Sequence, residues 1–405
     1  MKNGFYTNGI IFFMVFLFVF NILITAEKVD EPQALVKSNN KFGLDLYKKF
    51  NAKQGNLFFS PYSITSALLM TYEGAKGETA EEMRSVMHLP QSKNKIRTNF
   101  KDILDDINKK DAPYKLKTAN ALWIQKKYPF AEDYFNKIRK YYGGKVTNLD
   151  FSKKAEESRI TINEWIEGKT EDKIKNLIPK GMLNAMTVCV LTNAIYFKAN
   201  WLDEFRTELT RDEKFTLSSE KDVITPMMHN TDYYGYTETD NIQVLEMDYK
   251  GNEISMIVIL PKVNDIKKLE VTLDLKKLNC WRDSLRTKRV KVSLPKFKFE
   301  TKYFMSEDLQ ELGMKTAFEY PQADFTGISP TGELFISEVV HQTFVEVAEY
   351  GTEAAAATAV VMEAGAAMPT EEPKIFKADH PFIFIIQQKN TRNILFMGKL
   401  YDPTK

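Results

Sequence analysis

The sequence predicts a single α+β domain, and three observations lead to this prediction. Patterns with helical periodicity crowd the first half of the chain, whereas runs that alternate with a period of two crowd the second half. The two kinds of pattern interleave, and no repeat or long linker divides them. The length of 405 residues and the hydrophobic content of 43% are enough to build one large core.

The helices are predicted from apolar residues that recur every three or four positions. Residues 56–63 (NLFFSPYS) indicate a short strand that runs into a helix, with Ser60 as its cap and Pro61 in its first turn. Thr79 is expected to cap the helix over residues 77–83, because acidic residues follow it. Further helices are predicted over residues 38–51, 132–141, 160–176 and 305–312.

The strands are predicted from alternation and from runs rich in β-branched and aromatic residues. Residues 187–197 (TVCVLTNAIYF) are apolar on both faces, which is typical of a central strand that is covered on each side. Residues 381–386 and 394–400 are expected to pair with each other near the end of the chain. Other strands are predicted over residues 116–125, 227–236, 242–249, 253–260, 290–300 and 334–347.

Residues 1–26 are predicted to be a secretory signal peptide. Lys2 gives a positive start, residues 10–20 are an unbroken apolar run, and Thr25 and Ala26 offer small residues for cleavage. The apolar run is short for a membrane-spanning helix, and Asn21 follows it directly. We therefore expect residues 27–405 to form a single secreted, extracellular domain with no membrane segment in its mature form. An amino-terminal anchor that is retained is the alternative.

The charge balance gives no indication of nucleic acid binding. Lysine and arginine together number 56, and aspartate and glutamate number 54. The lysines within residues 101–117 are interleaved with aspartates, which favours a solvated surface over a site for a heparin-like polyanion. Cys189 and Cys280 are the only cysteines, and we expect two free thiols that are mostly buried.

The motifs of common enzyme classes are absent from the sequence. The four histidines are widely spaced and form no H-E-x-x-H zinc signature. Gly168, Lys169 and Thr170 lack the upstream glycine of a phosphate-binding loop, and residues 327–332 (GISPTG) do not match a nucleophile elbow. We therefore predict that the protein is not an enzyme and that it holds neither a metal nor a cofactor.

Residues 351–367 (GTEAAAATAVVMEAGAA) consist almost entirely of small side chains and valine, and two interpretations compete for them. The alanines favour a helix, since alanine is the best helix former. Alternation instead favours a strand, because the charges Glu353 and Glu363 fall on one face. The pattern alone leaves both structures open. The opposite face of the strand would carry Thr352, Ala354, Ala356, Thr358, Val360, Met362 and Ala364.

Six segments spread along the chain match, in the same order, the motifs of one known family. They are NLFFSPYS (56–63), TNAIYFKANW (192–201), LPKFKF (294–299), FVEVAEYGTEAAAA (344–357), DHPF (379–382) and LFMGK (395–399). On these segments the chain resembles the serpins over residues 36–404. The resemblance implies the serpin fold, with three β-sheets, eight to nine helices and an exposed reactive-centre loop over about residues 350–376.

The resemblance also implies a function, that of a secreted suicide-substrate inhibitor of serine proteases. In this family a protease attacks the loop and forms an acyl-enzyme, and the cleaved limb then inserts into the central sheet as a new strand. Small side chains would ease passage between two strands, and Gly351 would act as a flexible hinge. The implied hinge residues are Glu349, Gly351, Thr352, Glu353, Ala354, Ala355, Ala356, Ala357 and Thr358.

A polar cluster beneath the centre of the main sheet, where its strands part, is implied as well. The matching residues of this chain are Ser60, Ser63, Asn193 and His341. Helix capping and a satisfied core histidine are the alternative interpretation of the same residues.

Trp201, Lys296 and Glu349 match positions at the top of that sheet, where the hinge meets it. Lys296 and Glu349 are expected to form an ion pair that holds the loop. The alternative is an exposed pair that contributes little.

The usual family spacing from the hinge places the cleaved bond between Gly365 and Ala366. Glycine is a poor anchor for specificity, so Ala364 and Ala367 are alternatives, with Met368 disfavoured because a proline follows it. Such small side chains suit a shallow specificity pocket. The expected partner is therefore an elastase-like or subtilisin-like serine protease held as a covalent acyl complex, with a papain-like cysteine protease second.

The main alternative function is that of a non-inhibitory serpin, which would act as a carrier, chaperone or storage protein. Members that lost inhibition tend to carry bulky, charged or proline residues in the hinge. Thr352 and the alanines that follow it argue against this loss. In either case the product is expected to be a monomer.

Overall fold

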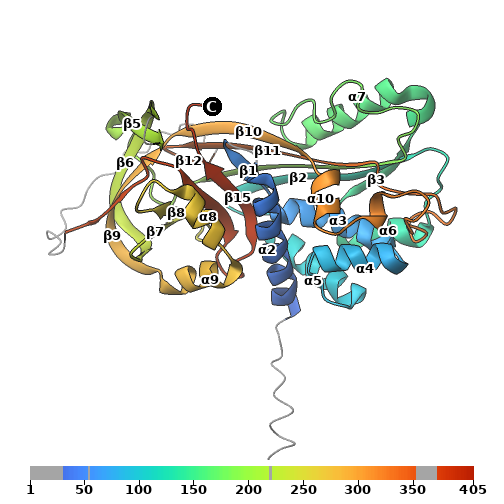
Figure 1. The fold of residues 1–405 in the computed structure, drawn as a ribbon, viewed down its shortest axis with the longest axis horizontal. Coiled ribbons are helices and arrows are strands. Elements are labelled where there is room, and N and C mark those ends of the chain that lie inside the picture. The colour runs from blue at the N-terminus through green and yellow to red at the C-terminus, as the bar shows by residue number, and fades with distance from the viewer. Residues whose placement is uncertain (1–30, 53–54, 219–220, 353–371) are drawn as a thin grey trace, which may run out of the picture.

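The structure is a computed structural model that describes residues 31–52, 55–218, 221–352 and 372–405, and it confirms the α+β fold. Nine α-helices and two short 3-10 helices occur in these residues (Figure 1). They are α2 (Glu31–Phe50), α3 (Pro61–Gly74), α4 (Gly77–Val86), α5 (Lys93–Ile107), α6 (Glu132–Tyr141), α7 (Phe151–Lys169), α8 (Ile266–Thr272), α9 (Leu275–Ser284), α10 (Ser306–Glu311), η1 (Thr207–Leu209) and η2 (Thr316–Phe318).

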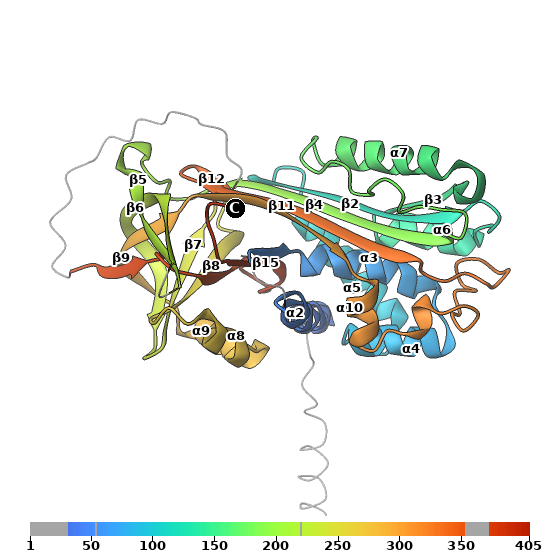
Figure 2. The same ribbon diagram turned by 45° about the horizontal axis from the view of Figure 1, so that its top comes forward.

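A six-stranded sheet runs through the middle of the molecule in the order β10-β11-β12-β4-β2-β3. Figure 2 shows this sheet as one layer, with α7 on one face and α3 on the other. Strand β4 is central, as its two apolar faces predict. The strands are β2 (Tyr114–Gln125), β3 (Lys145–Leu149), β4 (Cys189–Asn200), β10 (Phe297–Phe304), β11 (Glu338–Ala348) and β12 (Gly351–Thr352).

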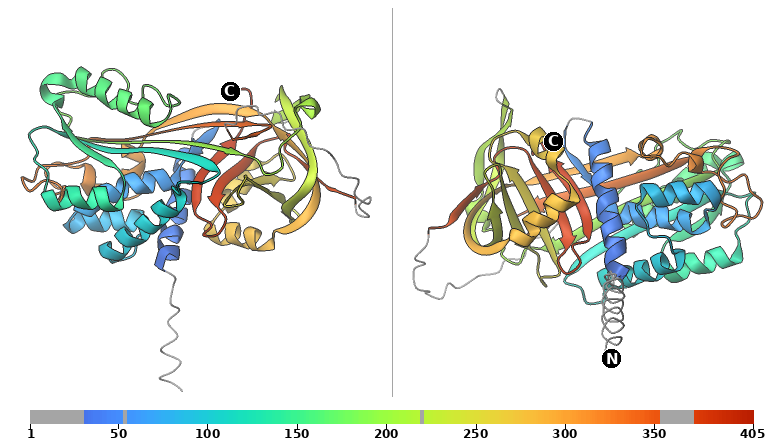
Figure 3. Two further views of the ribbon diagram at one scale, coloured as in Figure 1. Left: turned by 180° about the vertical axis from the view of Figure 1, so that it is seen from behind. Right: turned by 60° about the horizontal axis from the view of Figure 1, so that its bottom comes forward.

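The other strands form a nine-stranded sheet at one end of the molecule, and Figure 3 shows α2 standing between it and the helices α3 to α6. Strand β6 pairs with β5, β9 and β7 along its length, so two of the three expected sheets are joined through it. The strands are β1 (Leu57–Phe59), β5 (Arg211–Ser218), β6 (Lys221–Glu238), β7 (Ile242–Asp248), β8 (Ile254–Pro261), β9 (Arg286–Pro295), β13 (Lys374–Lys377), β14 (Phe382–Gln388) and β15 (Ile394–Leu400).

Two hydrophobic clusters stabilise this arrangement. The larger one fills the space between α2, α3 and the two sheets, and it includes Phe58, Phe384 and Phe396, whose rings stack. The smaller one lies on the opposite face of the six-stranded sheet, beneath α7. The helix α7 is therefore attached to the sheet by a small apolar cluster of its own.

Several predicted elements are confirmed by the structure. Ser60 caps α3 by accepting a hydrogen bond from the backbone of Ser63, and Pro61 is the first helical residue. The helix over residues 132–141 and the antiparallel pair β14 and β15 are also present. Both cysteines are free, but Cys280 is exposed, so only Cys189 is the buried thiol that we expected.

Other predicted elements were wrong in their bounds or role. Thr79 lies inside α4 rather than at its cap, and its hydroxyl accepts a hydrogen bond from the backbone of Asp324. The helix predicted over residues 160–176 is α7, which begins nine residues earlier because Asp150 caps it. The single strand predicted over residues 290–300 is two strands in different sheets, because the chain crosses between the sheets at Lys296.

Candidate functional site

The centre of the candidate site is the contact between β4 and β11, which we call the seam. The two strands pair directly and in parallel from Glu338 opposite Val190 to Thr343 opposite Ile195. Beyond that point they part, and the two residues of β12 fill the space between them, antiparallel to both. The sheet thus already holds the first two residues of a further strand at one end of the seam.

Gly351 begins β12, and its position accepts no side chain. Its φ of 148° lies in a region that residues with a Cβ rarely adopt. A Cβ built there would lie 2.0 Å from the backbone oxygen of Ala199 on β4. The close approach of the two backbones therefore requires glycine at this end of the seam.

Thr352 follows it and points into the larger core, where only 1% of the residue is exposed. Its hydroxyl lies 2.6 Å from the hydroxyl of Tyr249, which stacks on Trp201 with 4.4 Å between ring centroids. The indole of Trp201 in turn donates to the backbone oxygen of Ala348 at 3.0 Å. Trp201 is thus beside the hinge, as the family resemblance implied, whereas no sequence pattern pointed to Tyr249.

Glu349 and Lys296 form the expected ion pair, with 2.8 Å between Oε2 and Nζ. The carboxylate is 4% exposed and the lysine 38%, so the pair is half-buried rather than fully exposed. Thr210 also donates to the carboxylate, at 2.9 Å. Burial alone would raise the pKa of Glu349, but the hydrogen bonds from Lys296, the backbone and Thr210 outweigh it and hold the pKa below its ordinary value.

Residues 201–207, which end at the start of η1, hold the turn that leads into β12. The backbone amide of Trp201 donates to the oxygen of Tyr350 at 3.0 Å, and that of Phe205 donates to the oxygen of Glu349 at 2.9 Å. The hydroxyls of Thr207 and Tyr350 lie 3.2 Å apart. These contacts fix the direction in which the chain leaves the sheet after β11.

His341 lies on the seam itself, directly opposite Asn193, and is fully buried. The backbone amide of Ser60 donates to its Nε2 at 3.1 Å, so Nε2 carries no proton. Its Nδ1 therefore carries the proton and donates to the side-chain oxygen of Asn193. Burial lowers the pKa of His341 to about 3, which keeps the imidazole neutral at physiological pH.

The hydrogen bonds continue from the seam into α3 and β2. The side-chain nitrogen of Asn193 donates to the backbone oxygen of Ser63 at 2.8 Å and also contacts the side-chain oxygen of Asn120. Asn120 donates to the hydroxyl of Ser66 at 2.8 Å. The structure thus brings Ser60, Ser63, Asn193 and His341 together. Asn120 was not among the predicted residues of this cluster, although an amide in the middle of the strand predicted over residues 116–125 was a signal for it.

On the opposite face, α7 and the segment that follows it lie across the seam. Side chains from both seam strands belong there to the smaller hydrophobic cluster, together with residues of α7 and of the segment after it. Any strand that parted the seam would therefore also disturb the cluster that attaches α7. The seam residues in this cluster are Val190 and Ala194 on β4 and Val340 and Phe344 on β11.

Many of the predicted site residues lie outside the described residues, since residues 353–371 are not described. The predicted signal peptide, residues 1–26, lies outside them too. The site residues concerned are Glu353, Ala354, Ala355, Ala356, Ala357 and Thr358 of the hinge, and Ala364, Gly365, Ala366, Ala367 and Met368 around the cleaved bond.

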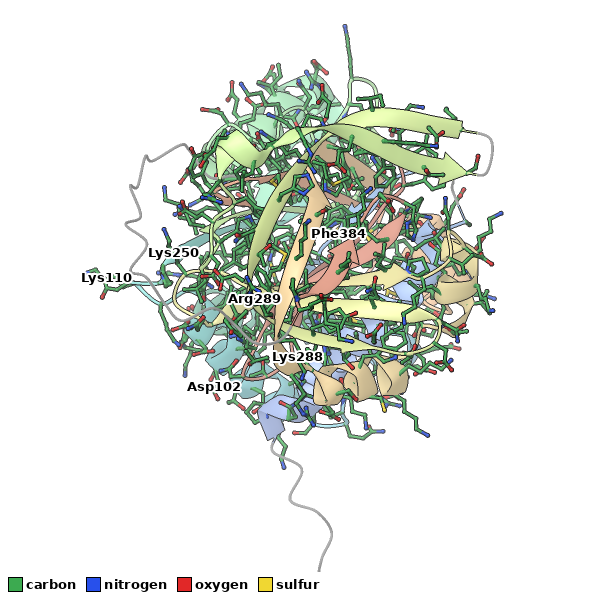
Figure 4. The ribbon with its side chains drawn as sticks, turned by 90° about the vertical axis from the view of Figure 1, so that its left-hand side faces the viewer. Asp102, Lys110, Lys250, Lys288, Arg289 and Phe384 are labelled. Atoms are coloured by element: carbon green, nitrogen blue, oxygen red, sulfur yellow. The ribbon has the colours of Figure 1, made fainter. Side chains whose placement is uncertain are left out.

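Two lysines of the stretch over residues 101–117 pair with its own aspartates. Lys101 pairs with Asp105 at 2.5 Å and Lys109 with Asp106 at 2.8 Å. Figure 4 shows Asp102 and Lys110 on the same side of the molecule. In the part of the chain that the structure describes, no three acidic, histidine or cysteine side chains are arranged to hold a metal, and no helix is long and apolar enough to span a membrane.

Comparisons with known proteins agree with this geometry. A family model described as "Serpin (serine protease inhibitor)" matches residues 37–403. An uncharacterised serpin-like protein of Thermococcus kodakarensis is 44% identical over 93% of this chain and 87% of its own length. The human leukocyte elastase inhibitor is 40% identical over 92% of this chain and 100% of its own. The structure of human thyroxine-binding globulin complexed with its ligand superposes with a TM-score of 0.84 at 29% identity, covering 93% of this chain and 100% of that one.

Proposed function

This chain belongs to the serpin family, and we propose that it traps serine proteases by inserting its cleaved loop into the seam. The observation that carries the proposal is β12, which already stands in antiparallel register between β4 and β11. A strand begun at one end of a parallel pair needs only continued separation of that pair to extend. Cleavage of the loop would release the chain to do so.

The register of β12 predicts which residues of β4 and β11 each further residue of an inserted strand would lie opposite. Thr352 lies opposite Val347 and Ala199, so a strand that kept this register would put position 356 opposite Thr343 and Ile195. Position 358 would then separate His341 from Asn193. Positions 354, 356 and 358 would share the face of Thr352 and enter the larger core. Ala354, Ala356 and Thr358 are small enough for that core.

The other face of the inserted strand would be covered as well. In the same register, positions 355, 357, 359 and 361 lie opposite the seam residues of the smaller cluster, which α7 and the segment after it cover. They would pass beneath α7 instead of facing water, which explains why this face is also small and apolar there. The charges Glu353 and Glu363 would lie beyond the two ends of that cover.

Elastase-like and subtilisin-like serine proteases are the proposed targets, with papain-like cysteine proteases second. Only glycine and alanine occupy positions 364 to 367, around the bond from Gly365 to Ala366. The similarity to the human leukocyte elastase inhibitor supports the same class. We propose secretion on the apolar run of the amino terminus, and a monomer as the active form.

The experiment is incubation of the purified protein with elastase, subtilisin, chymotrypsin, trypsin and papain. We expect elastase or subtilisin to give a complex that survives boiling in detergent, because the acyl bond is covalent. Mass spectrometry of the released carboxy-terminal peptide should show cleavage after one of residues 364 to 367. Cleavage only after Lys374 or Lys377 would contradict the proposed specificity.

A carrier function is the second candidate, favoured by the likeness to a hormone-binding globulin. It predicts that every protease in the panel cleaves the loop without leaving a boiling-resistant complex. Heating tests insertion of the loop independently. A serpin that inserts its loop should melt at a much higher temperature after cleavage, whereas a chain that does not insert should show no rise.

A further inference from the structure

Lys145 on β3 holds its charge against two aromatic rings at the border between α7 and the sheet. Its Nζ lies 4.8 Å from the ring centre of Trp123 and 5.1 Å from that of Trp165, and the two indoles meet edge to face at 5.4 Å. No described carboxylate forms an ion pair with Lys145. Burial, and then repulsion by Lys169, lower the pKa of Lys145. We call Trp123, Lys145 and Trp165 the clamp.

The clamp links α7 to the seam. Trp165 belongs to α7 and Trp123 to β2. The indole nitrogen of Trp123 donates to the hydroxyl of Thr192 on β4 at 2.8 Å. Thr192 lies directly opposite Val340 across the seam, next to the pair formed by Asn193 and His341. One chain of contacts thus runs from the helix, through the ammonium group, to a residue pair that an inserted strand would separate.

The helix must lift for a strand to pass beneath it, and the clamp resists lifting. The apolar cluster under α7 is small, so individual contacts at its border carry a large share of the attachment. A cation over a ring is held more strongly where water is excluded, and Lys145 is half-buried with no competing carboxylate. Lifting Trp165 away would leave that ammonium group with a single ring.

We propose that Lys145 is a positioning residue that latches α7 onto the sheet and thereby sets how fast the seam accepts a strand. The proposal rests on the insertion mechanism proposed above. It assigns the timing of insertion to a residue on β3, which β2 separates from the seam strands. Slow insertion leaves time for hydrolysis of the acyl-enzyme, whereas fast insertion favours trapping of the protease.

The test measures strand acceptance without any protease. A synthetic peptide with the sequence of residues 352–363 (TEAAAATAVVME) is incubated with the uncleaved protein, and annealing is followed on native gels. Hydrogen exchange of the α7 amides is recorded on the same samples. The variants are Lys145→Gln, which removes the charge, and Lys145→Arg, which keeps it. The matched control is Lys140→Gln, since Lys140 on α6 lies 4.9 Å from the ring of Tyr141 at an exposed site.

We expect Lys145→Gln to anneal the peptide and exchange its α7 amides about tenfold faster, the factor expected for one desolvated cation–π contact. Lys145→Arg and Lys140→Gln should stay within about twofold of the unchanged protein. Equal rates for Lys145→Gln and the unchanged protein overturn the latch, as does an arginine variant that behaves like the glutamine variant. If the peptide anneals to none of the proteins, the insertion mechanism fails, while the exchange of the α7 amides still decides whether Lys145 holds the helix.

Discussion

The two ends of the seam differ in how they are held. At the end near β12 the strands are already apart, and a half-exposed charge pair, Lys296 with Glu349, ties the turn above them. In the middle the strands pair directly, and a fully buried network of neutral groups around His341 and Asn193 joins them to α3. A charge pair near water can be lost and replaced by hydration, whereas a buried neutral network must be broken as a unit.

This difference separates two tasks. The end near β12 keeps the uncleaved chain in register, ready to extend, while the middle keeps the sheet closed. A change at the first end should alter whether insertion begins, and loss of its charge pair should also lower the stability of the uncleaved protein. A change in the middle should alter how stable the closed sheet is. The following variants test that division, from the largest expected effect to the smallest.

Thr352→Arg should abolish inhibition. The hydroxyl of Thr352 lies in the larger core beside Tyr249, and an arginine there would be buried without a partner. We expect the variant to be cleaved by the target protease without a boiling-resistant complex. Thr352→Ser keeps the hydroxyl and is the matched control. A variant with arginine that still trapped protease would show that insertion does not follow the register of β12.

Glu349→Lys should lower the free energy of unfolding by about 3 kcal/mol, because it leaves Lys296 facing a second cation at a nearly buried site. Glu346→Lys is the control, since Glu346 on β11 pairs with Lys298 on β10, close by in the sequence but at a more exposed place. Its effect should stay below about 1 kcal/mol. Denaturant unfolding measures both, and size-exclusion chromatography after mild heating should show more polymer for Glu349→Lys. Equal losses in the two variants would contradict a special role for Glu349.

Acid should destabilise the middle of the seam through His341. Its pKa of about 3 in the folded protein lies below the value of 6.5 expected after unfolding, so the unfolded chain binds more protons between these values. The contribution to stability is complete above about pH 6.5 and falls as the pH drops towards 3. Between pH 7 and pH 5 we expect a loss of about 2 kcal/mol that is absent in His341→Gln. Parallel curves for the two proteins would contradict the assignment.

Ala357→Glu should raise the number of inhibitor molecules consumed per trapped protease about fivefold, which corresponds to about 1 kcal/mol in the partition between trapping and release. The glutamate would have to pass beneath α7 during insertion. Glu353→Ala changes a charge on the same face beyond the cover of α7, and it should leave that number unchanged. A reversed order of the two variants would contradict the register proposed for the inserted strand.

Much of the fold could be predicted because its signals are local. The cap at Ser60 with Pro61, the central strand β4 and the final strand pair each follow from residues close together in sequence. The errors arose where distant parts of the chain decide. Thr79 is a residue type that often caps helices, but here its hydroxyl accepts a hydrogen bond from the backbone of Asp324. The run over residues 290–300 divides because its two halves pair in different sheets.

The candidate site divides in the same way. The alternation of small residues after Gly351 left helix and strand open, and the family motifs then implied an inserting strand and a hinge. The sequence could not state the register of β12, the cover that α7 places over the seam, or the clamp around Lys145. Side-chain size and periodicity are properties of neighbouring residues. Register, burial and the pairing of a charge with distant rings arise only when separate segments pack together.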